Sequence, residues 1–284
     1  MPLEDPSPFM SPVEFRLLRD LIHAHSGLYF REDMQYLLER RLAPRLRLLG
    51  LASYGAYHRY LRHDPQRAGE LEIAVEALTT NETYFFREPL QLRSFSEEIL
   101  PELAERRAEE RRLRIWSAGC SSGEEAFTAA ILVRSSGLFA NWDVGVLGSD
   151  IARRVLAIAR AGCYGAHAFR GVEAEAMIRW FRPAGERWTV DDDTRKIVSF
   201  AHINLLDEAA VDEVEPVDCI FCRNVLIYFD MAARRRVLGS LHRRLRPGGY
   251  LLLGHSESLL QVTADFEIAQ LKGDLAYRKP GERS

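Results

Sequence analysis

Long apolar runs and strong net charge are both absent from this sequence. No stretch approaches the roughly 18 apolar residues of a membrane-spanning helix, and the N-terminus lacks the charged and then apolar pattern of a signal peptide. The formal net charge is -3 over 284 residues, so no general electrostatic field indicates nucleic acid or a membrane surface as a partner. We therefore expect a cytoplasmic protein that neither binds nucleic acid nor inserts into a membrane.

Cysteine is scarce, with four residues in the chain, and no disulfide framework is expected from them. A chain with 47% hydrophobic residues buries a sizeable core without such staples. Cys219 and Cys222 form a CxxC pattern within the apolar run VDCIFC, but residues three apart on a strand point to opposite faces. The eight histidines show no pair at ligand spacing within a helix. We expect reduced thiols and no metal site.

The stretch 113–133, LRIWSAGCSSGEEAFTAAILV, has the pattern of a strand, a tight loop and a helix. Its loop is built of small residues, including Ala118 and Gly119, so that backbone amides and the helix N-terminus can approach a ligand. The loop differs from GxGxxG, and Glu124 and Glu125 follow its last glycine at once. Two carboxylates there repel the pyrophosphate of a dinucleotide.

The same carboxylates favour a ligand that carries an ammonium group. A molecule with adenosine at one end and an amino acid at the other is S-adenosylmethionine, and a second feature agrees with it. Asp150 ends the next apolar run, where an acidic side chain can hold a ribose diol. The alternative is that the two glutamates only complement the helix dipole.

The first 80 or so residues show helical periodicity and no strand pattern. Ser11, Pro12 and Glu14 form a helix start signal, and three further helices follow over about 33–49, 54–62 and 70–78. Pro44 predicts a kink or an irregular turn in the second of these. That helix concentrates four arginines, which form either a solvated face or a surface for an acidic partner: Arg40, Arg41, Arg45 and Arg47.

Alternating strands and helices over the rest of the chain predict a parallel α/β sheet with an antiparallel end, closed by a hairpin with its turn at 272–274. A helix is expected over 90–112 and a turn at 246–249. Residues 164–200 interrupt the alternation. We expect there a helix at 173–181 and a hairpin in which RWTV and KIVSF flank the turn DDDT, either an embellishment or a docking edge for a peptide.

Four segments, in order, resemble the CheR-type chemotaxis receptor methyltransferases over about 11–279: TTNETYFFRE, SAGCSSGEEAF, FCRNVLIYFD and GGYLLLGHSE. The resemblance implies an N-terminal all-helical domain and a Rossmann-like class I methyltransferase domain that depends on S-adenosylmethionine and has a small inserted β subdomain. The corresponding boundaries are 1–88, which includes a segment covering the cofactor, 89–284, and an insertion at about 164–200. The implied reaction is methyl transfer to glutamate side chains of chemoreceptors, leaving S-adenosylhomocysteine.

Carried over position by position, the resemblance assigns most of the cofactor site. Asn81, Thr83 and Arg87 lie over the cofactor, Glu125 lies near its amino group and Asp150 holds the ribose. The remaining positions are Asn204 and Leu205 by the adenine, and Arg223 with Asn224 at the end of the fourth strand. From the residues alone, Leu205 is equally well explained as core.

The reaction needs no general base, because a glutamate with a pKa of about 4.3 is already ionised at neutral pH. Alignment and the removal of water supply the catalysis. We expect Arg87 and Tyr228 to line the reacting carboxylate, Tyr228 through its hydroxyl and Arg87 through its charge. The alternative for Tyr228 is a core aromatic.

The turn in FRPAGERWTV is shorter and less glycine-rich than in relatives that dock a receptor's C-terminal pentapeptide, so we expect no need for that tether. The arginine helix matches the basic helix that the family lays against acidic receptor helices, and we expect a monomer. Two other readings are an amide or amine methyltransferase and a non-catalytic scaffold that senses the cofactor. Prolines are missing after Asn224, which disfavours the first, and the intact polar set disfavours the second.

Overall fold

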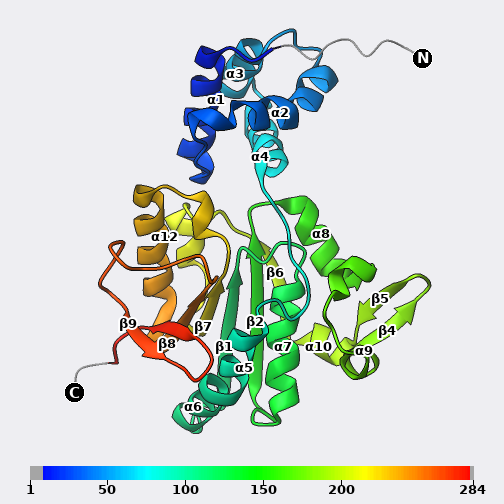
Figure 1. The fold of residues 1–284 in the computed structure, drawn as a ribbon, viewed down its shortest axis with the longest axis vertical. Helices are drawn as coiled ribbons and strands as arrows, with labels where there is room; N and C mark the ends of the chain where they lie inside the picture. Colours follow the sequence, from blue (N-terminus) through cyan, green and yellow to red (C-terminus); the bar gives the residue numbers. More distant parts are fainter. Residues whose placement is uncertain (1–8, 282–284) are drawn as a thin grey trace. The chain divides into compact units, whose positions relative to one another are not determined.

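The computed structural model describes residues 9–281 and divides them into two compact units (Figure 1). One unit holds the described residues up to Thr80 together with Tyr228–Asp230. The other holds the remaining described residues. The second unit carries every strand named below, so the two are treated in turn.

The first unit is all-helical, as the periodicity predicts. Its helices are α1 (Pro12–Ser26), α2 (Gln35–Leu49), α3 (Tyr54–His63) and α4 (Arg67–Leu78), with a 3-10 turn at Glu32–Met34. The Ser11 side chain accepts the Glu14 N–H in a capping box, and Gly27 ends α1 at φ 74°. Leucines from α1 and α2 and tyrosines from α3 are fully buried and form the core of this unit.

Pro44, at which the sequence predicts a kink or an irregular turn, lies inside a continuous helix. Helix α2 runs without interruption from Gln35 to Leu49 with Pro44 inside it. Leu38, Leu42 and Leu46, which flank the proline at helical spacing, are all completely buried. This burial offsets the cost of a helix-interior proline, about 3 kcal/mol.

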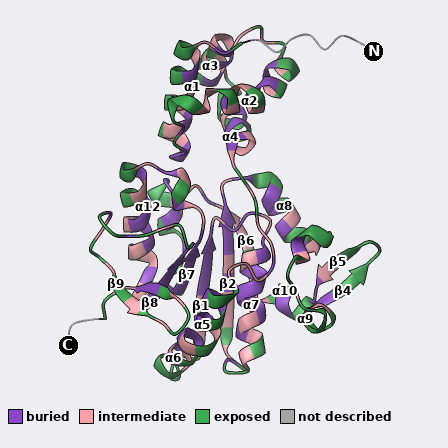
Figure 2. Cartoon of the chain, viewed as in Figure 1, coloured by how far each residue is buried: buried purple, intermediate pink, exposed green. Residues whose placement is uncertain are grey.

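The second unit is built on a seven-stranded sheet with the order β6-β2-β1-β7-β8-β10-β9. The strands are β1 (Arg112–Ala118), β2 (Asp143–Asp150), β6 (Val198–His202), β7 (Val217–Cys222), β8 (Leu245–Leu253), β9 (Glu267–Gln270) and β10 (Leu275–Arg278). The first five in the order are parallel, whereas β10 is antiparallel to both β8 and β9. The closing hairpin and the parallel sheet with an antiparallel end are confirmed. Strand β7 is buried along its whole length (Figure 2).

Helices α7 (Glu124–Ser136), α8 (Arg153–Ala161), α11 (Glu208–Asp212) and α12 (Met231–Arg244) connect the parallel strands. The connection before β1 differs from the prediction, because the helix ends at Arg106 and not near residue 112. It consists of α5 (Pro89–Ser94), a π-helical turn (Phe95–Ile99) and α6 (Leu100–Arg106). The Arg107 side chain turns to the buried carboxylate of Asp218, 2.8 Å away, and Arg111 takes φ 48°. The charged run is therefore a turn that leads into the sheet.

The expected hairpin around DDDT is wrong. The small sheet pairs β5 (Arg187–Val190) with β4 (Phe181–Ala184) and β3 (Cys163–Tyr164), and its hairpin turn contains Gly185. The helix before it, α9, spans Ala174–Trp180, and a 3-10 turn spans Ala166–Phe169. DDDT starts the short helix α10 (Asp192–Lys196), because the Asp191 side chain caps it by accepting the Thr194 N–H.

KIVSF accordingly contributes β6, the edge strand of the main sheet. The turn expected at 246–249 is also wrong, since these residues belong to β8, where an irregular register with β7 absorbs Gly248 at φ 69°. Within residues 9–281, no helix is long and apolar enough to cross a membrane.

Candidate active site

The loop between β1 and α7 is shaped by glycines. The amides of Gly119 and Cys120 both donate to the carbonyl of Ser149 at the end of β2, each over 2.8 Å. Gly119 has φ 83°, and a Cβ there would overlap Val225 Cγ2. Gly123 has φ 94°, and a Cβ there would lie 2.9 Å from the ring of Phe200. Side chains are excluded at both positions, so the backbone of this loop is held close to its neighbours.

Glu125 stands in the first turn of α7 between a hydroxyl and a guanidinium. Its Oε1 accepts the Ser117 hydroxyl over 2.7 Å, and its Oε2 lies 3.3 Å from Arg223 Nη1. Burial raises the pKa of the Glu125 carboxyl, while the charge of Arg223 opposes that shift. Burial also raises the pKa of Glu124, which turns instead to the Ser122 hydroxyl. The two glutamates therefore have different partners, and only Glu125 contacts a cation.

Asp150 ends β2, at the same edge of the sheet as the loop. Its Oδ2 accepts the Ser121 N–H over 2.8 Å and its Oδ1 accepts the Ala152 N–H over 2.9 Å. The side chain is buried, which raises its pKa. Ala118, at the end of neighbouring β1, is completely buried. The carboxyl ends of adjacent parallel strands thus bring Asp150 to the glycine loop, as expected for an open α/β sheet.

The loop after β7 is fixed by a residue that sequence reasoning missed. Glu257 accepts the backbone N–H groups of Asn224 (2.7 Å), Gly254 (2.8 Å) and Ile227 (3.2 Å). Asn224 has φ 59°, a left-handed conformation that this carboxylate supports. Glu257 lies in the segment GGYLLLGHSE, which carries part of the family resemblance. Nothing in that segment indicated that the Glu257 carboxylate accepts three backbone N–H groups.

Arg223 ties the segment before α5 to this loop. Its Nη2 donates to the carbonyl of Arg87 over 2.6 Å and lies 2.9 Å from Glu88 Oε2. Glu88 is a second residue that sequence reasoning did not select. It has φ 60°, and Phe86 two residues earlier has φ 58°. The backbone of this segment is therefore strained on both sides of Arg87.

The rest of the segment 81–88 lies on the loops of the same unit. The Asn81 carbonyl accepts the Ser121 hydroxyl over 3.1 Å. Phe85 is buried among aromatic rings of the small sheet and its flanks. The guanidinium of Arg87 donates to the Glu82 carbonyl over 3.1 Å, and Thr83 is half-buried. Asn81 and Arg87 thus contact the glycine loop and Arg223 through their main-chain carbonyls.

Asn204 and Leu205 follow the carboxyl end of β6. The Asn204 Oδ1 accepts the Leu206 N–H over 3.1 Å, which makes a local turn. The side chain of Leu205 is buried. Both positions lie one strand beyond Asp150, since His202 of β6 pairs with Asp150 of β2.

Tyr228 and the four arginines belong to the first unit. The Tyr228 carbonyl accepts the Tyr29 N–H over 2.8 Å. Arg45 is bound to the buried Glu70, with Nε 2.9 Å from Oε1, and Arg41 donates to the carbonyls of Leu78 and Thr79. Arg40 and Arg47 are exposed. Arg87 is a residue of the second unit, so its joint role with Tyr228 stays a prediction.

Two buried polar atoms at the end of β7 fit a polar ligand. Arg223 Nε and Asn224 Oδ1 have no hydrogen-bond partner among the residues that the structure describes. A buried donor or acceptor left in this state is costly unless water or a ligand group satisfies it. The site thus offers an acceptor on Asn224, a donor on Arg223, the carboxylates of Glu125 and Asp150, and a glycine loop. These groups suit the amino acid and the ribose of S-adenosylmethionine.

Comparison with known families decides between the readings. Residues 81–274 match the family described as CheR methyltransferase, SAM binding domain, and residues 13–79 match CheR methyltransferase, all-alpha domain. The chain belongs to the CheR methyltransferase family. The two matches cover the helical unit and the sheet unit in turn, so the resemblance stated from four segments is confirmed.

Curated relatives cover almost the whole chain. Chemotaxis protein methyltransferase 2 of Vibrio cholerae is 35% identical over 95% of this chain and 94% of its own length. Chemotaxis protein methyltransferases 1 and 2 of Pseudomonas aeruginosa are 35% and 37% identical, over 94% and 93% of this chain and 97% and 95% of their own lengths. This CheR-family chain is an S-adenosylmethionine-dependent chemotaxis protein glutamate methyltransferase. The fold class is confirmed as well.

Proposed function

We propose that the residues gathered at the carboxyl edge of the sheet hold S-adenosylmethionine for methyl transfer to glutamates in the cytoplasmic domain of methyl-accepting chemotaxis receptors. The observation that carries this proposal is the meeting of three loops at that edge. Asp150 holds the Ser121 amide of the glycine loop, and Arg223 of the third loop lies against Glu125.

Each polar end of the cofactor has a matching group. The Glu125 carboxylate suits the ammonium and the guanidinium of Arg87 suits the carboxylate, while Asp150 suits the ribose diol. Asn204 and Leu205 suit the adenine, and Arg223 with Asn224 supply the unsatisfied donor and acceptor. Ala118 and Gly119 leave room for the ligand, and Asn81 and Thr83 belong to the segment that covers it.

The chemistry requires alignment more than activation. When bound, the cofactor supplies a methyl group already activated by its sulfonium. A carboxylate oxygen of the receptor glutamate forms the new C–O bond as the S–C bond breaks, and that bonding pair stays on the sulfur of S-adenosylhomocysteine. Arg87 offsets the charge of the incoming carboxylate and Tyr228 orients it through its hydroxyl. No proton has to be removed, because the glutamate is ionised at neutral pH.

The loop after β7 argues against an amide or amine acceptor. Such enzymes accept the hydrogens of a planar amine with Asn or Asp followed by two prolines and an aromatic residue. Here Asn224 is followed by Val225 and Leu226, and the two prolines are missing. A non-catalytic sensor is disfavoured because Arg87, Glu125, Asp150 and Asn224 are all present.

The receptor side is proposed from the first unit. Arg40 and Arg47 are exposed and suit an acidic receptor helix. Arg41 donates to main-chain carbonyls of the unit, and Arg45 pairs with the buried Glu70. The hairpin turn between β4 and β5 consists of Gly185 and Glu186 alone, and this short turn supports methylation without a C-terminal receptor tether. We also propose a cytoplasmic monomer.

The test is transfer of labelled methyl groups from S-adenosylmethionine to receptor-enriched membranes from a strain without its own methyltransferase. We expect base-labile label on a receptor band. Receptors in which the methylated glutamates are changed to alanine should stay unlabelled, and so should wild-type receptors incubated with the Asp150→Ala enzyme. Label that resists base would indicate transfer to nitrogen and contradict the proposal.

A further inference from the structure

Arg170 is an exposed residue of the insertion that follows the 3-10 turn Ala166–Phe169 and has no part in the function proposed above. It contacts the segment 81–88 twice. Its Nη2 lies 2.7 Å from Glu82 Oε1, and its Cζ lies 4.0 Å from the ring centroid of Tyr84. A guanidinium at this distance from a ring makes a favourable cation–π contact. Arg170 therefore holds one carboxylate and one ring of the segment that is proposed to cover the cofactor.

The same two residues also hold Arg87. The Nη1 atom of Arg87 donates to the main-chain carbonyl of Glu82 over 3.1 Å, and its Cζ lies 5.8 Å from the ring centroid of Tyr84. Among the residues that the structure describes, Arg87 forms no ion pair with a carboxylate. Arg87 and Arg170 thus share Glu82 and Tyr84, but only Arg170 takes the Glu82 side chain.

The Glu82 carboxylate is within the electrostatic reach of both arginines. The Arg170 guanidinium lowers the pKa of Glu82 through its hydrogen bond and its charge, and the charge of Arg87 lowers it further. Both side chains of the Glu82–Arg170 pair are partly exposed, so the pair adds little to stability. Its consequence is local: while Arg170 occupies the carboxylate, the guanidinium of Arg87 keeps donors for another carboxylate.

The backbone on either side of this pair is fixed. The Ala168 carbonyl accepts the Phe85 N–H over 2.9 Å, and the rings of Phe85 and Phe169 stack with centroids 5.2 Å apart. Phe85 is buried. Arg170 directly follows Phe169, so its side chain leaves the backbone next to the point where the insertion binds the segment 81–88.

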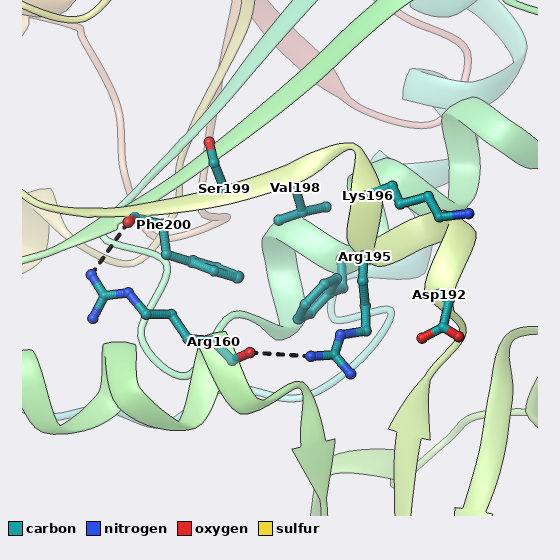
Figure 3. Close-up of a pocket in the computed structure, with 8 residues that line it drawn as sticks. Arg160, Asp192, Arg195, Lys196, Val198, Ser199 and Phe200 are labelled. Atoms are coloured by element: carbon teal, nitrogen blue, oxygen red, sulfur yellow. Dashed lines mark hydrogen bonds between the residues drawn. The ribbon is translucent and has the colours of Figure 1, made fainter.

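The other end of the insertion is attached to helices of the main sheet. Arg195 of α10 donates to the Arg160 carbonyl of α8 over 3.5 Å, a contact drawn in Figure 3. Asp191, which caps α10, lies 2.7 Å from Arg134 of α7. Helices α7 and α8 follow β1 and β2, so the insertion that carries Arg170 is anchored to the sheet that carries the proposed cofactor site.

We propose that Arg170 is a positioning residue for methyl transfer, which pairs with the Glu82 carboxylate and thereby leaves the Arg87 guanidinium for a ligand carboxylate. The inference rests on the role proposed for Arg87. Without Arg170, the Glu82 side chain is released within the same short segment as Arg87, pairs with it and withdraws it from the ligand. Arg170 itself contacts neither the cofactor nor the receptor, and acts through Glu82 and Tyr84.

The test is calorimetric titration of the full chain with S-adenosylhomocysteine. Arg170→Gln should weaken binding about tenfold, because Arg87 then loses its charge-assisted contact with the ligand carboxylate. Adding Glu82→Gln to Arg170→Gln should restore most of the lost affinity, since the competing charge is removed. In a chain that carries Arg87→Gln, Arg170→Gln should cause no further loss, because both changes act on the same contact.

Arg179→Gln is the matched control. Arg179 is an exposed arginine of α9 in the same insertion, and it too lies over an aromatic ring, with its Cζ 4.7 Å from the ring centroid of Trp180. It should keep the wild-type affinity. Thermal unfolding shows whether each variant is folded. Arg170→Lys keeps a cation for Glu82 and should bind more tightly than Arg170→Gln, so the test stands on a second variant as well.

Three results would overturn the proposal. Wild-type affinity in Arg170→Gln would show that Arg87 does not depend on Arg170. A loss that Glu82→Gln fails to restore would show that the pair only supports the segment 81–88. Wild-type affinity in Arg87→Gln would remove the proposed function of Arg87 and this inference with it, whereas in the first two cases a weakened Arg87→Gln variant leaves the proposed function intact.

Discussion

Glu257 and Asn224 are joined by a hydrogen bond of 2.7 Å from the Asn224 N–H to the Glu257 carboxylate. The same oxygen accepts the Gly254 N–H, so the end of β8 and the loop after β7 share one anchor. Removing the Glu257 carboxylate allows the Asn224 backbone to leave its left-handed conformation. Glu257 is therefore a positioning residue for the proposed cofactor site.

Glu257→Gln should weaken S-adenosylhomocysteine binding about tenfold, which corresponds to about 1.4 kcal/mol. Calorimetry measures this, and Glu267→Gln on β9, at an exposed position, is the control. A lowered melting temperature with unchanged affinity would show that Glu257 has a structural role only.

Asp150→Ala should weaken S-adenosylhomocysteine binding at least tenfold, because the carboxylate both holds the Ser121 amide and is proposed to hold the ribose. Hydrogen bonds to a charged group contribute about 1.5–3 kcal/mol each. Asp143→Ala provides the comparison, as Asp143 lies at the other end of β2 in an exposed ion pair with Arg114. Exposed pairs contribute about 0–1 kcal/mol. Equal losses in the two variants would refute the assignment.

Gly119→Ala should lower the free energy of unfolding by about 2–4 kcal/mol and abolish cofactor binding. The added methyl overlaps Val225 Cγ2, which adds overpacking to the cost of a positive φ. Gly137→Ala tests φ alone, because Gly137 has φ 69° with nothing within 4 Å of its Cβ position. It should lower stability by about 1 kcal/mol. Urea unfolding of both variants separates the cost of overpacking from the cost of the positive φ.

The affinity for S-adenosylhomocysteine should fall as the pH is lowered through the pKa of Glu125. Burial raises that pKa above the ordinary value of 4.5, and only the ionised carboxylate attracts the ligand ammonium. For folding the sign is opposite. A raised pKa favours the folded chain at low pH, and that contribution is lost as the pH rises through the folded value.

The measurement is calorimetry between about pH 5 and pH 8 on wild type and Glu125→Gln. Glu124 and Asp150 also have raised pKa values, so the difference between the two proteins isolates Glu125. Parallel pH profiles for both would exclude it as the ammonium partner.

Arg45→Ala should lower the free energy of unfolding of the helical unit by about 3–5 kcal/mol. It leaves the buried Glu70 without its guanidinium, although Tyr57 still donates to Glu70 Oε1 over 2.7 Å. Arg40→Ala, at an exposed position of the same helix, should change stability by less than about 0.5 kcal/mol and reduce receptor methylation instead. Reversed effects in thermal unfolding and methyl transfer would show that Arg45 is the receptor contact.

Short-range sequence patterns predicted the fold well where a few neighbouring residues determine the local structure. The Ser11 to Glu14 capping box, the Gly27 helix end and the closing hairpin could all be derived from the sequence, because each depends on contacts between near neighbours. KIVSF was misassigned because its pattern fits any strand. Only its pairing with β2, in which Val198 lies beside Val146, shows that it belongs to the main sheet. Pairing between segments so far apart in the chain cannot be recognised from the few residues of either segment.

The same distinction applies to the site. Asp150 ends β2 and Glu125 lies in the first turn of the helix that follows β1, so their location at one edge of the sheet is a consequence of parallel topology. Glu88 and Glu257 act through groups far away in sequence, and no pattern of side chains records such contacts. The arginine helix shows a third case, since periodicity cannot tell Arg45, which pairs with Glu70, from Arg40, which is exposed.

Tyr164 lies in β3, the first strand of the small sheet, and its hydroxyl donates to the Ser122 carbonyl in the glycine loop over 2.7 Å. The insertion therefore supports the loop that is proposed to hold the cofactor. A chimera that exchanges this subdomain with that of a relative also exchanges the residue that contacts the glycine loop. Such grafts should carry a Tyr at this position, or changes in receptor preference will be confounded with changes in turnover.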